Sequence, residues 1–157
     1  MKFHILTLFP EMFSSFTGTS ICKRAIEAGH VEISLIDFRE YTTDKHRRVD
    51  DYPFGGGAGM LMSVQPIYDA VQSVKKEGSH IVFASPSGKT LNAKKAQELS
   101  EKDHLIFICG HYEGVDQRVI DLLKPEEILV VDLHEMTVAE AAYYLEKELD
   151  NAPEYIK

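Results

Sequence analysis

The sequence predicts an α/β protein with a mainly parallel, open sheet and helices on both faces. Short apolar runs typical of buried strands alternate with segments of helical periodicity along the 157 residues. A strand, a helix and a second strand within the first ~40 residues indicate a right-handed βαβ unit. The length fits a single domain over residues 1–157.

Breaker residues and alternation fix the elements of the first part of the chain. Pro10 ends the first strand, because proline cannot donate to a ladder. Ser20 can cap the second helix and Gly29 can end it. The second strand alternates apolar and polar side chains. The strands are expected at 2–9, 31–38, 81–84, 105–109 and 128–131, and the helices at 11–16, 21–28, 61–76, 93–99, 115–123 and 137–149.

Periodicity and caps locate the later helices. Ile67, Val71 and Val74 fall on one helical face. Asn92 can cap the next helix. Thr137 and Glu140 form a capping box for the last one, and the tail after it is expected to be frayed.

Composition limits the possible functions. The formal net charge is -8, so no global basic field attracts nucleic acid, and any such contact must be local or supplied by a partner. Cys22 and Cys109 lack metal-ligand spacing and are expected to be reduced, buried thiols of a cytoplasmic protein, with no metal. No apolar run reaches membrane-spanning length, and the N-terminus lacks a signal-peptide pattern.

Two segments follow predicted buried strands directly. Gly110 and Gly114 can take positive φ after the strand at 105–109, and Glu113 places a carboxylate beside exposed amides. Ser85-Pro86-Ser87-Gly88 follows the strand before it. In open α/β sheets ligands lie outside the carboxyl ends of strands, so the two turns are candidates for one pocket. Taken alone, the first of these turns favours an ordinary strand-to-helix connection.

A long polar segment, 39–60, separates the second strand from the next helix. Loops of this length inside a compact domain are usually functional or disordered. Its cluster Lys45-His46-Arg47-Arg48 is the most basic part of an acidic chain. Gly55, Gly56, Gly57 and Gly59 fit a backbone that bends tightly around a ligand. A flexible, solvated loop is the alternative.

Several long motifs together resemble the bacterial tRNA (guanine-N1)-methyltransferases of the knotted SPOUT superfamily. The resemblance runs from residue 2 to about residue 132, and its motifs have the family's order and spacing. It implies S-adenosylmethionine as cofactor, held in a trefoil-knotted crevice at a homodimer interface. It also implies methyl transfer to N1 of the tRNA guanine beside the anticodon. The motifs are Leu8-Phe9-Pro10-Glu11-Met12-Phe13, residues 46–60 from His46 to Met60, Val64-Gln65-Pro66, Ser85-Pro86-Ser87-Gly88 and residues 109–119.

The resemblance assigns residues to the two ligands. The cofactor would be lined by Ser85, Pro86, Gly110, Tyr112, Glu113 and Gly114. The target base would lie near Gly55, Gly56, Gly57 and Gly59, and tRNA phosphates near His46, Arg47 and Arg48. A neutral guanine N1 has no free lone pair, so its proton must be removed, and the rest of the catalysis is mostly positioning.

The C-terminal part departs from the family. Where the family reads Ile-Gly-Asp-Tyr-Val-Leu-Thr-Gly-Gly-Glu-Leu, this chain keeps only Asp132. The family's catalytic aspartate linker and tRNA-binding domain are expected to be absent. Glu113 and Asp132 are carboxylates near the right place, but neither replaces that base convincingly, so the catalytic residue stays unassigned. The segment 132–141 is instead similar to the Asp-Leu-His-Gly opening of small MutS-related (Smr) domains.

This composite C-terminus leaves several alternatives open. The chain is either an engineered chimera or a diverged, truncated paralogue. Its last helix either packs conventionally, which leaves the chain unknotted, or threads with a degraded pocket. For function, the alternatives are a methyltransferase with reduced or no activity, a cofactor-binding or dimerising module without methyl transfer, and a protein engineered to study the fold.

Overall fold

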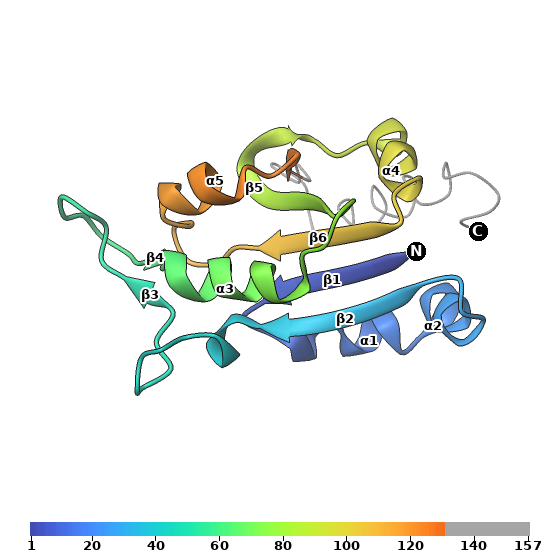
Figure 1. Cartoon of the computed structure of the whole chain (residues 1–157), viewed down its shortest axis with the longest axis horizontal. Helices are drawn as coiled ribbons and strands as arrows, with labels where there is room; N and C mark the ends of the chain where they lie inside the picture. Colours follow the sequence, from blue (N-terminus) through green and yellow to red (C-terminus); the bar gives the residue numbers. More distant parts are fainter. Residues whose placement is uncertain (131–157) are drawn as a thin grey trace, which may run out of the picture.

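A five-stranded parallel sheet forms the centre of the computed structural model, which describes residues 1–130 (Figure 1). The strand order is β2-β1-β6-β5-β7, and every neighbouring pair is parallel. This confirms the predicted α/β class. The strands are β1 (Lys2–Thr7), β2 (Glu32–Asp37), β5 (His80–Thr90), β6 (His104–Cys109) and β7 (Glu127–Val130).

Helices cover both faces of this sheet. On one face α3 and α5 pack on Leu6, Ile106 and Ile108, which are all fully buried. On the other face Leu99 of α4 packs with Leu105 and other strand residues in a smaller cluster. The helices are α1 (Ser14–Thr17), α2 (Ser20–Glu27), α3 (Val64–Val74), α4 (Ala93–Ser100) and α5 (Gln117–Leu123), with 3-10 turns at η1 (Pro10–Phe13) and η2 (Phe38–Glu40).

The expected loop at 39–60 contains more structure than its composition indicates. β3 (Asp50–Asp51) pairs antiparallel with β4 (Leu61–Met62). The prediction of a helix from Leu61 was therefore wrong: α3 begins at Val64, because Leu61 and Met62 are extended. Met62 is fully buried, so its apolar side chain belongs to the core but not to the helix face.

Two other helix starts also differ from the sequence prediction. Thr19 occupies the N-cap position of α2, and Ser20, the predicted cap, is the first helical residue, with φ +50°. Thr19 has extended backbone, which suits a cap, although its hydroxyl donates to the carbonyl of Ser15. α5 begins at Gln117, two residues later than predicted, and the carboxylate of Asp116 caps it by accepting from the amide of Arg118 at 2.9 Å.

The predicted turn at Ser85–Gly88 is instead a bulge inside a long strand. Both Ala84 and Lys89 align with Leu129 of β7, so the residues between them leave the ladder. Gly88 makes this possible, because a Cβ there would lie 2.6 Å from the backbone carbon of Leu129. Only a residue without a side chain allows such an approach.

Several predictions concern residues beyond 130, outside the described part of the chain. They are the last helix, the tail, the Smr-like segment, Asp132 and the knot. None of the helices within residues 1–130 has the length and apolar character that a bilayer crossing requires.

A buried histidine pair joins the amino ends of β1 and β6. His4 Nδ1 lies 2.7 Å from His104 Nε2, and His104 Nδ1 lies 2.7 Å from the hydroxyl of Ser79. Each of the two contacts needs one proton, so both hydrogen bonds of the series Ser79–His104–His4 can form when the two rings are neutral. Burial lowers the pKa of both histidines, and the charges of Lys2 and Lys76 lower each pKa further.

We expect the free energy of unfolding to fall as the pH is lowered from about 8 to about 5.5. Below the unfolded pKa of about 6.5 the unfolded chain takes up protons that the buried pair resists, so the unfolded state gains stability. Urea titrations across this interval test it. His104→Gln removes one of the two groups and is expected to flatten the dependence, whereas His30→Gln, at an exposed histidine, is expected to leave it unchanged. Equal slopes for His104→Gln and the unsubstituted protein would contradict the assignment.

Candidate functional site

The first part of β5, from His80 to the start of its bulge at Ala84, and β6 reach their carboxyl ends side by side. Ala84 of β5 pairs with Cys109 of β6, and the next residues along these parallel strands are Ser85 and Gly110. The structure thus brings together the two segments that the sequence placed in one pocket. β6 ends here and β5 leaves its ladder with β6, at the carboxyl end of the sheet where open α/β folds bind ligands.

The second segment uses its glycines differently from the prediction. Gly114 has φ +135°, as expected for a glycine-dependent turn, but Gly110 is not in the positive-φ region. A Cβ at Gly110 would meet Val115 Cγ1 at 3.6 Å, an ordinary contact. Tyr112, with φ +58°, takes the left-handed conformation instead. Gly110 therefore presents no side chain beside Val115 and Phe83, while Tyr112 and Gly114 shape the turn.

β4 attaches this turn, residues 110–114, to the glycine-rich loop, residues 55–60. The amide of Met62 donates to the carbonyl of Gly114 at 3.0 Å, and the amide of Asp116 donates back to the carbonyl of Met62 at 3.0 Å. A third bond runs from the amide of Glu113 to the carbonyl of Met60 at 3.2 Å. The predicted cofactor turn and the predicted substrate loop are therefore parts of one hydrogen-bonded unit.

Side-chain packing brings the same two segments into contact. A Cβ at Gly59 would lie 2.3 Å from Glu113 Cγ, so the Glu113 side chain occupies the space that any larger residue would need. Gly59 also has φ +90°. Gly55, Gly56 and Gly57 have positive φ as well, but no atom lies within 4 Å of a Cβ there. The loop thus contacts Glu113 at one end and is open at the other.

The basic cluster is partly engaged within the protein. Arg48 Nη2 lies 2.9 Å from Asp44 Oδ2, and the hydrogen bond from Arg48 is the main reason that the pKa of Asp44 lies well below its usual range. The amide of His46 also donates to Asp44, at 2.8 Å. Arg47 Nε donates to the carbonyl of Arg39 at 3.3 Å. Arg48 remains 69% exposed in this pair, so part of its guanidinium is still open to solvent.

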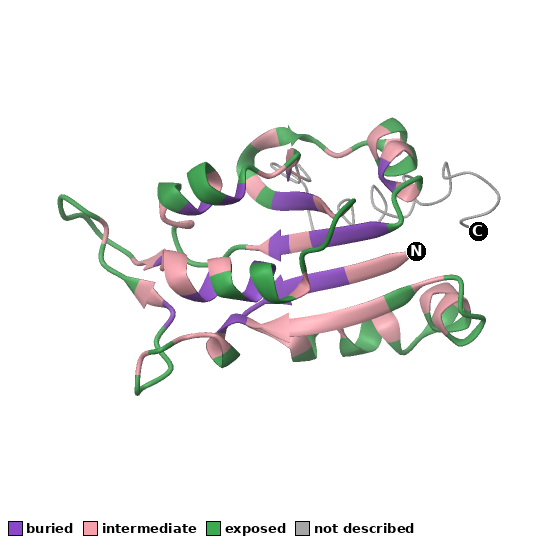
Figure 2. Ribbon diagram, viewed as in Figure 1, coloured by how far each residue is buried: buried purple, intermediate pink, exposed green. Residues whose placement is uncertain are grey.

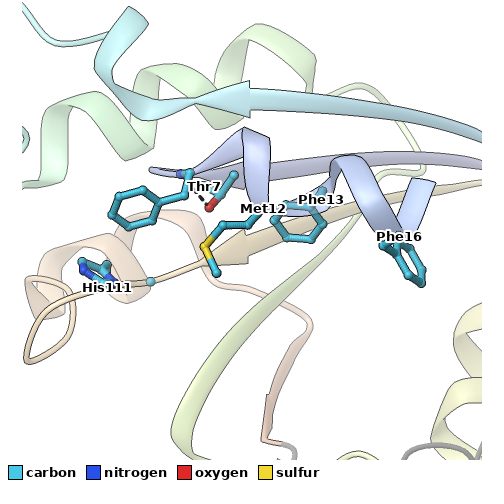
Figure 3. A pocket seen from close by; sticks show the side chains of 7 residues that line it. Thr7, Met12, Phe13, Phe16 and His111 are labelled. Carbon is cyan, nitrogen blue, oxygen red and sulfur yellow. Dashed lines mark hydrogen bonds between the residues drawn. The ribbon is translucent and has the colours of Figure 1, made fainter. Parts of the chain in front are cut away.

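A cavity of about 480 Å³ opens beside Gly110, at the carboxyl ends of β1 and β6 (Figure 3). His111 lies edge-on to Phe9, with ring centroids 4.9 Å apart, and edge-on to Tyr112 at 4.7 Å. Gly110 is the only predicted cofactor residue that lines this cavity, whose other lining residues are Thr7, Phe9, Met12, Phe13, Phe16 and His111.

Sequence reasoning assigned no site role to these other cavity residues. It placed Phe9 in a strand, and Met12, Phe13 and Phe16 in a short helix or at its end. No local sequence pattern indicated the cavity; the structure shows that Met12 and Phe16, two of its lining residues, are 72% and 53% exposed.

Cys109 directly precedes Gly110, which lines this cavity. It is a free thiol, as is Cys22, and both are half-buried, so the prediction of fully buried thiols was wrong. Burial raises the pKa of the Cys109 thiol. Cys109 is therefore a neutral side chain near the site and is not activated as a nucleophile.

The site offers backbone groups and open space in place of a preformed set of charged catalysts. Glu113 is the carboxylate that contacts the glycine-rich loop. Asp116 is occupied by its cap and by Arg118 Nη2 at 2.6 Å, and the hydrogen bond from Arg118 lowers the pKa of Asp116. Such an arrangement can position a ligand beyond the carboxyl ends of the strands.

Comparison with known proteins identifies a matching family and similar relatives. Residues 1–142 match the model of the family described as tRNA (Guanine-1)-methyltransferase TrmD. Curated relatives named tRNA (guanine-N(1)-)-methyltransferase, from Listeria welshimeri and Listeria monocytogenes, are 51% identical over 136 residues, which is 84% of this chain. A relative of the same name from Bacillus cereus (strain AH820) is 51% identical over 135 residues. The chain spans 56% of the length of the Listeria proteins and 55% of the Bacillus protein.

We expect Gly59→Ala to destabilise the protein more than Gly55→Ala. Both positions have φ +90°, so an alanine is strained by about 1–2 kcal/mol at either. Only Gly59→Ala also collides with Glu113, which adds about 1–3 kcal/mol. Urea unfolding gives both losses. In a Glu113→Ala background the colliding atoms are gone, and the two glycine substitutions are expected to cost the same. Equal costs already in the unsubstituted background would contradict the contact.

Proposed function

The chain belongs to the tRNA (guanine-1)-methyltransferase family, and we propose that it binds S-adenosylmethionine at the joined carboxyl ends of β5 and β6. The observation that carries the proposal is the pairing of Ala84 with Cys109, which puts Ser85 next to Gly110 at one sheet edge. S-adenosylmethionine supplies an electrophilic methyl group on a sulfonium centre.

The residues at this edge fit such a ligand. Between Ala84 and Lys89 the backbone of β5 leaves its ladder with β7, and beyond Ala84 it no longer pairs with β6. Its polar groups can therefore meet polar edges of an adenosine. Beside them Gly110 presents no side chain, and the nearest atoms to a Cβ there belong to the apolar Val115 and Phe83. Open apolar space flanked by a few backbone donors and acceptors is typical of cofactor sites.

We further propose that the glycine-rich loop receives the guanine of a tRNA. Gly55, Gly56 and Gly57 leave the backbone open on the side of any added Cβ, so a flat base can approach it closely. The hydrogen bonds from β4 hold this loop beside the cofactor turn. Removal of the guanine N1 proton requires a base, and the described residues offer Glu113 in contact with the loop; the base itself is unassigned.

The assembly is part of the same proposal. We propose a homodimer in the cytoplasm, as the family resemblance implies. The support from the structure is the exposed apolar surface of Met12 and Phe16 beside the cavity, since such surface in a folded protein usually meets a partner.

A second candidate function is a cofactor-binding module without methyl transfer. The observation that favours it is the engagement of Asp116 by Arg118, with no carboxylate of the described residues assigned as the base. A site without a base for the guanine N1 proton can bind the cofactor but cannot complete the reaction.

Titration calorimetry with S-adenosylmethionine, with sedimentation on the same sample, tests the first proposal. We expect micromolar affinity and a dimer. Gly110→Ala is expected to weaken binding about tenfold, or about 1.4 kcal/mol, because its methyl group takes up room at the proposed cofactor site. Its melting temperature is expected to be unchanged, since the new Cβ makes only ordinary contacts.

A methyl-transfer assay separates the two candidate functions. A tRNA transcript with guanine beside the anticodon is compared with one that carries adenine there. Transfer to the guanine transcript alone supports the methyltransferase, and cofactor binding without transfer supports the binding module. Absence of binding at millimolar cofactor would contradict both.

A further inference from the structure

The β3–β4 arm, residues 50–62, carries the two most exposed large apolar side chains in the described part of the chain. Tyr52 is 77% exposed and Phe54 is 107% exposed. The arm extends away from the central sheet in Figure 1, and most of its tip is exposed in Figure 2. Two neighbouring aromatic rings held in water indicate a surface that binds something.

Neither ring is needed to hold the arm in place. The base of the arm is anchored by Val49 and Met62, which are 2% and 0% exposed. The amide of Ser63 donates to the carbonyl of Val49 at 2.8 Å. Together with the β3–β4 pairing, these contacts fix the arm through residues other than its two aromatics.

The tip itself has internal hydrogen bonds. The amide of Tyr52 donates to Asp51 Oδ1 at 2.8 Å, and the amide of Gly56 donates to the carbonyl of Pro53 at 3.0 Å. Pro53, between the two aromatics, has its φ fixed by its ring. The rings are thus attached to a constrained backbone, which lowers the entropy lost when a ligand packs against them.

The surroundings of the rings favour single-stranded RNA over an apolar protein surface. The loop that leads into β3 carries Lys45 and Arg47, which form no ion pair within the described residues, whereas Arg48 is paired with Asp44 and lies near Asp50 and Asp51. Glycines follow the rings directly and let a nucleotide approach the backbone. Aromatic rings beside cations are the usual means of binding unpaired nucleotides, because bases stack on the rings and phosphates meet the cations.

We propose that Tyr52 and Phe54 stack on unpaired bases that neighbour the base held at the glycine-rich loop. The choice of RNA rests on the proposed function, whereas the stacking role is a property of the arm. Gly55 follows Phe54 directly, and Gly59 contacts Glu113 at the cofactor turn. Bases stacked on the arm are therefore continuous with the one presented to that turn, and the arm selects looped-out RNA over duplex RNA.

Fluorescence anisotropy with a short, unstructured oligoribonucleotide and the full chain tests this. Tyr52→Ala and Phe54→Ala are each expected to weaken binding about tenfold, within the range for loss of one stacked base. Tyr52→Phe and Phe54→Tyr keep the rings and are expected to keep the affinity. Leu122→Ala, which removes an exposed apolar side chain of α5, is the matched control and is expected to change nothing. Melting temperatures of all variants show that they fold.

Several outcomes would overturn the proposal. One is an unsubstituted protein that does not bind the oligoribonucleotide, and another is alanine variants that bind it as well as the unsubstituted protein. A third is a shift of the sedimentation coefficient in the alanine variants without loss of RNA affinity, which would make the rings a self-association surface. Titration calorimetry with S-adenosylmethionine on the same samples reports on the cofactor site separately. If the protein binds the cofactor and the alanine variants keep their RNA affinity, the stacking role alone is rejected. If the alanine variants lose RNA affinity but the protein does not bind the cofactor, the stacking role is supported and the proposed function is rejected.

Discussion

The candidate site depends on the hydrogen bonds that β4 makes on its two sides. Leu61 and Met62 pair with β3 on one side, and Met62 exchanges bonds with Gly114 and Asp116 on the other. Met62 is fully buried, so this junction is part of the core. Because one short strand joins both segments, the glycine-rich loop and the turn after β6 cannot move independently. Ligands bound to the two segments would be positioned relative to each other by the backbone, which is the main requirement of a transfer reaction.

The buried histidine pair and the candidate ligand site lie at opposite ends of the sheet. The amino ends of β1 and β6 carry the buried pair His4 and His104, whose neutral rings complete a hydrogen-bonded chain. The carboxyl ends carry the bulge of β5, the turn after β6 and the cavity beside Gly110. At the carboxyl ends, the residues of the β5 bulge have backbone groups that do not pair in the sheet. This division leaves the ligand edge free to keep glycines and exposed rings that would weaken a core.

The sequence predicted the parallel sheet because buried parallel strands appear as apolar runs, and the run before Gly110 is β6. It also made the segments at Ser85 and Gly110 candidates for one pocket, and the structure shows that β5 and β6 are neighbours. β4 was missed because two residues are too short to show alternation. The bulge of β5 was missed because Gly88 depends on Leu129, far along the chain. The contact between Gly59 and Glu113 and the cavity beside Phe9 are likewise tertiary, and no local pattern reports them.

Hydrogen–deuterium exchange with and without S-adenosylmethionine tests the central claim most directly, because it reports on each backbone segment separately. We expect the cofactor to slow exchange at residues 85–88 and 110–114 together, with smaller protection at 59–62 through β4. Protection confined to the cavity residues near Phe9 and Phe16, or protection of only one of the two strand ends, would contradict a single site at the joined carboxyl ends of β5 and β6.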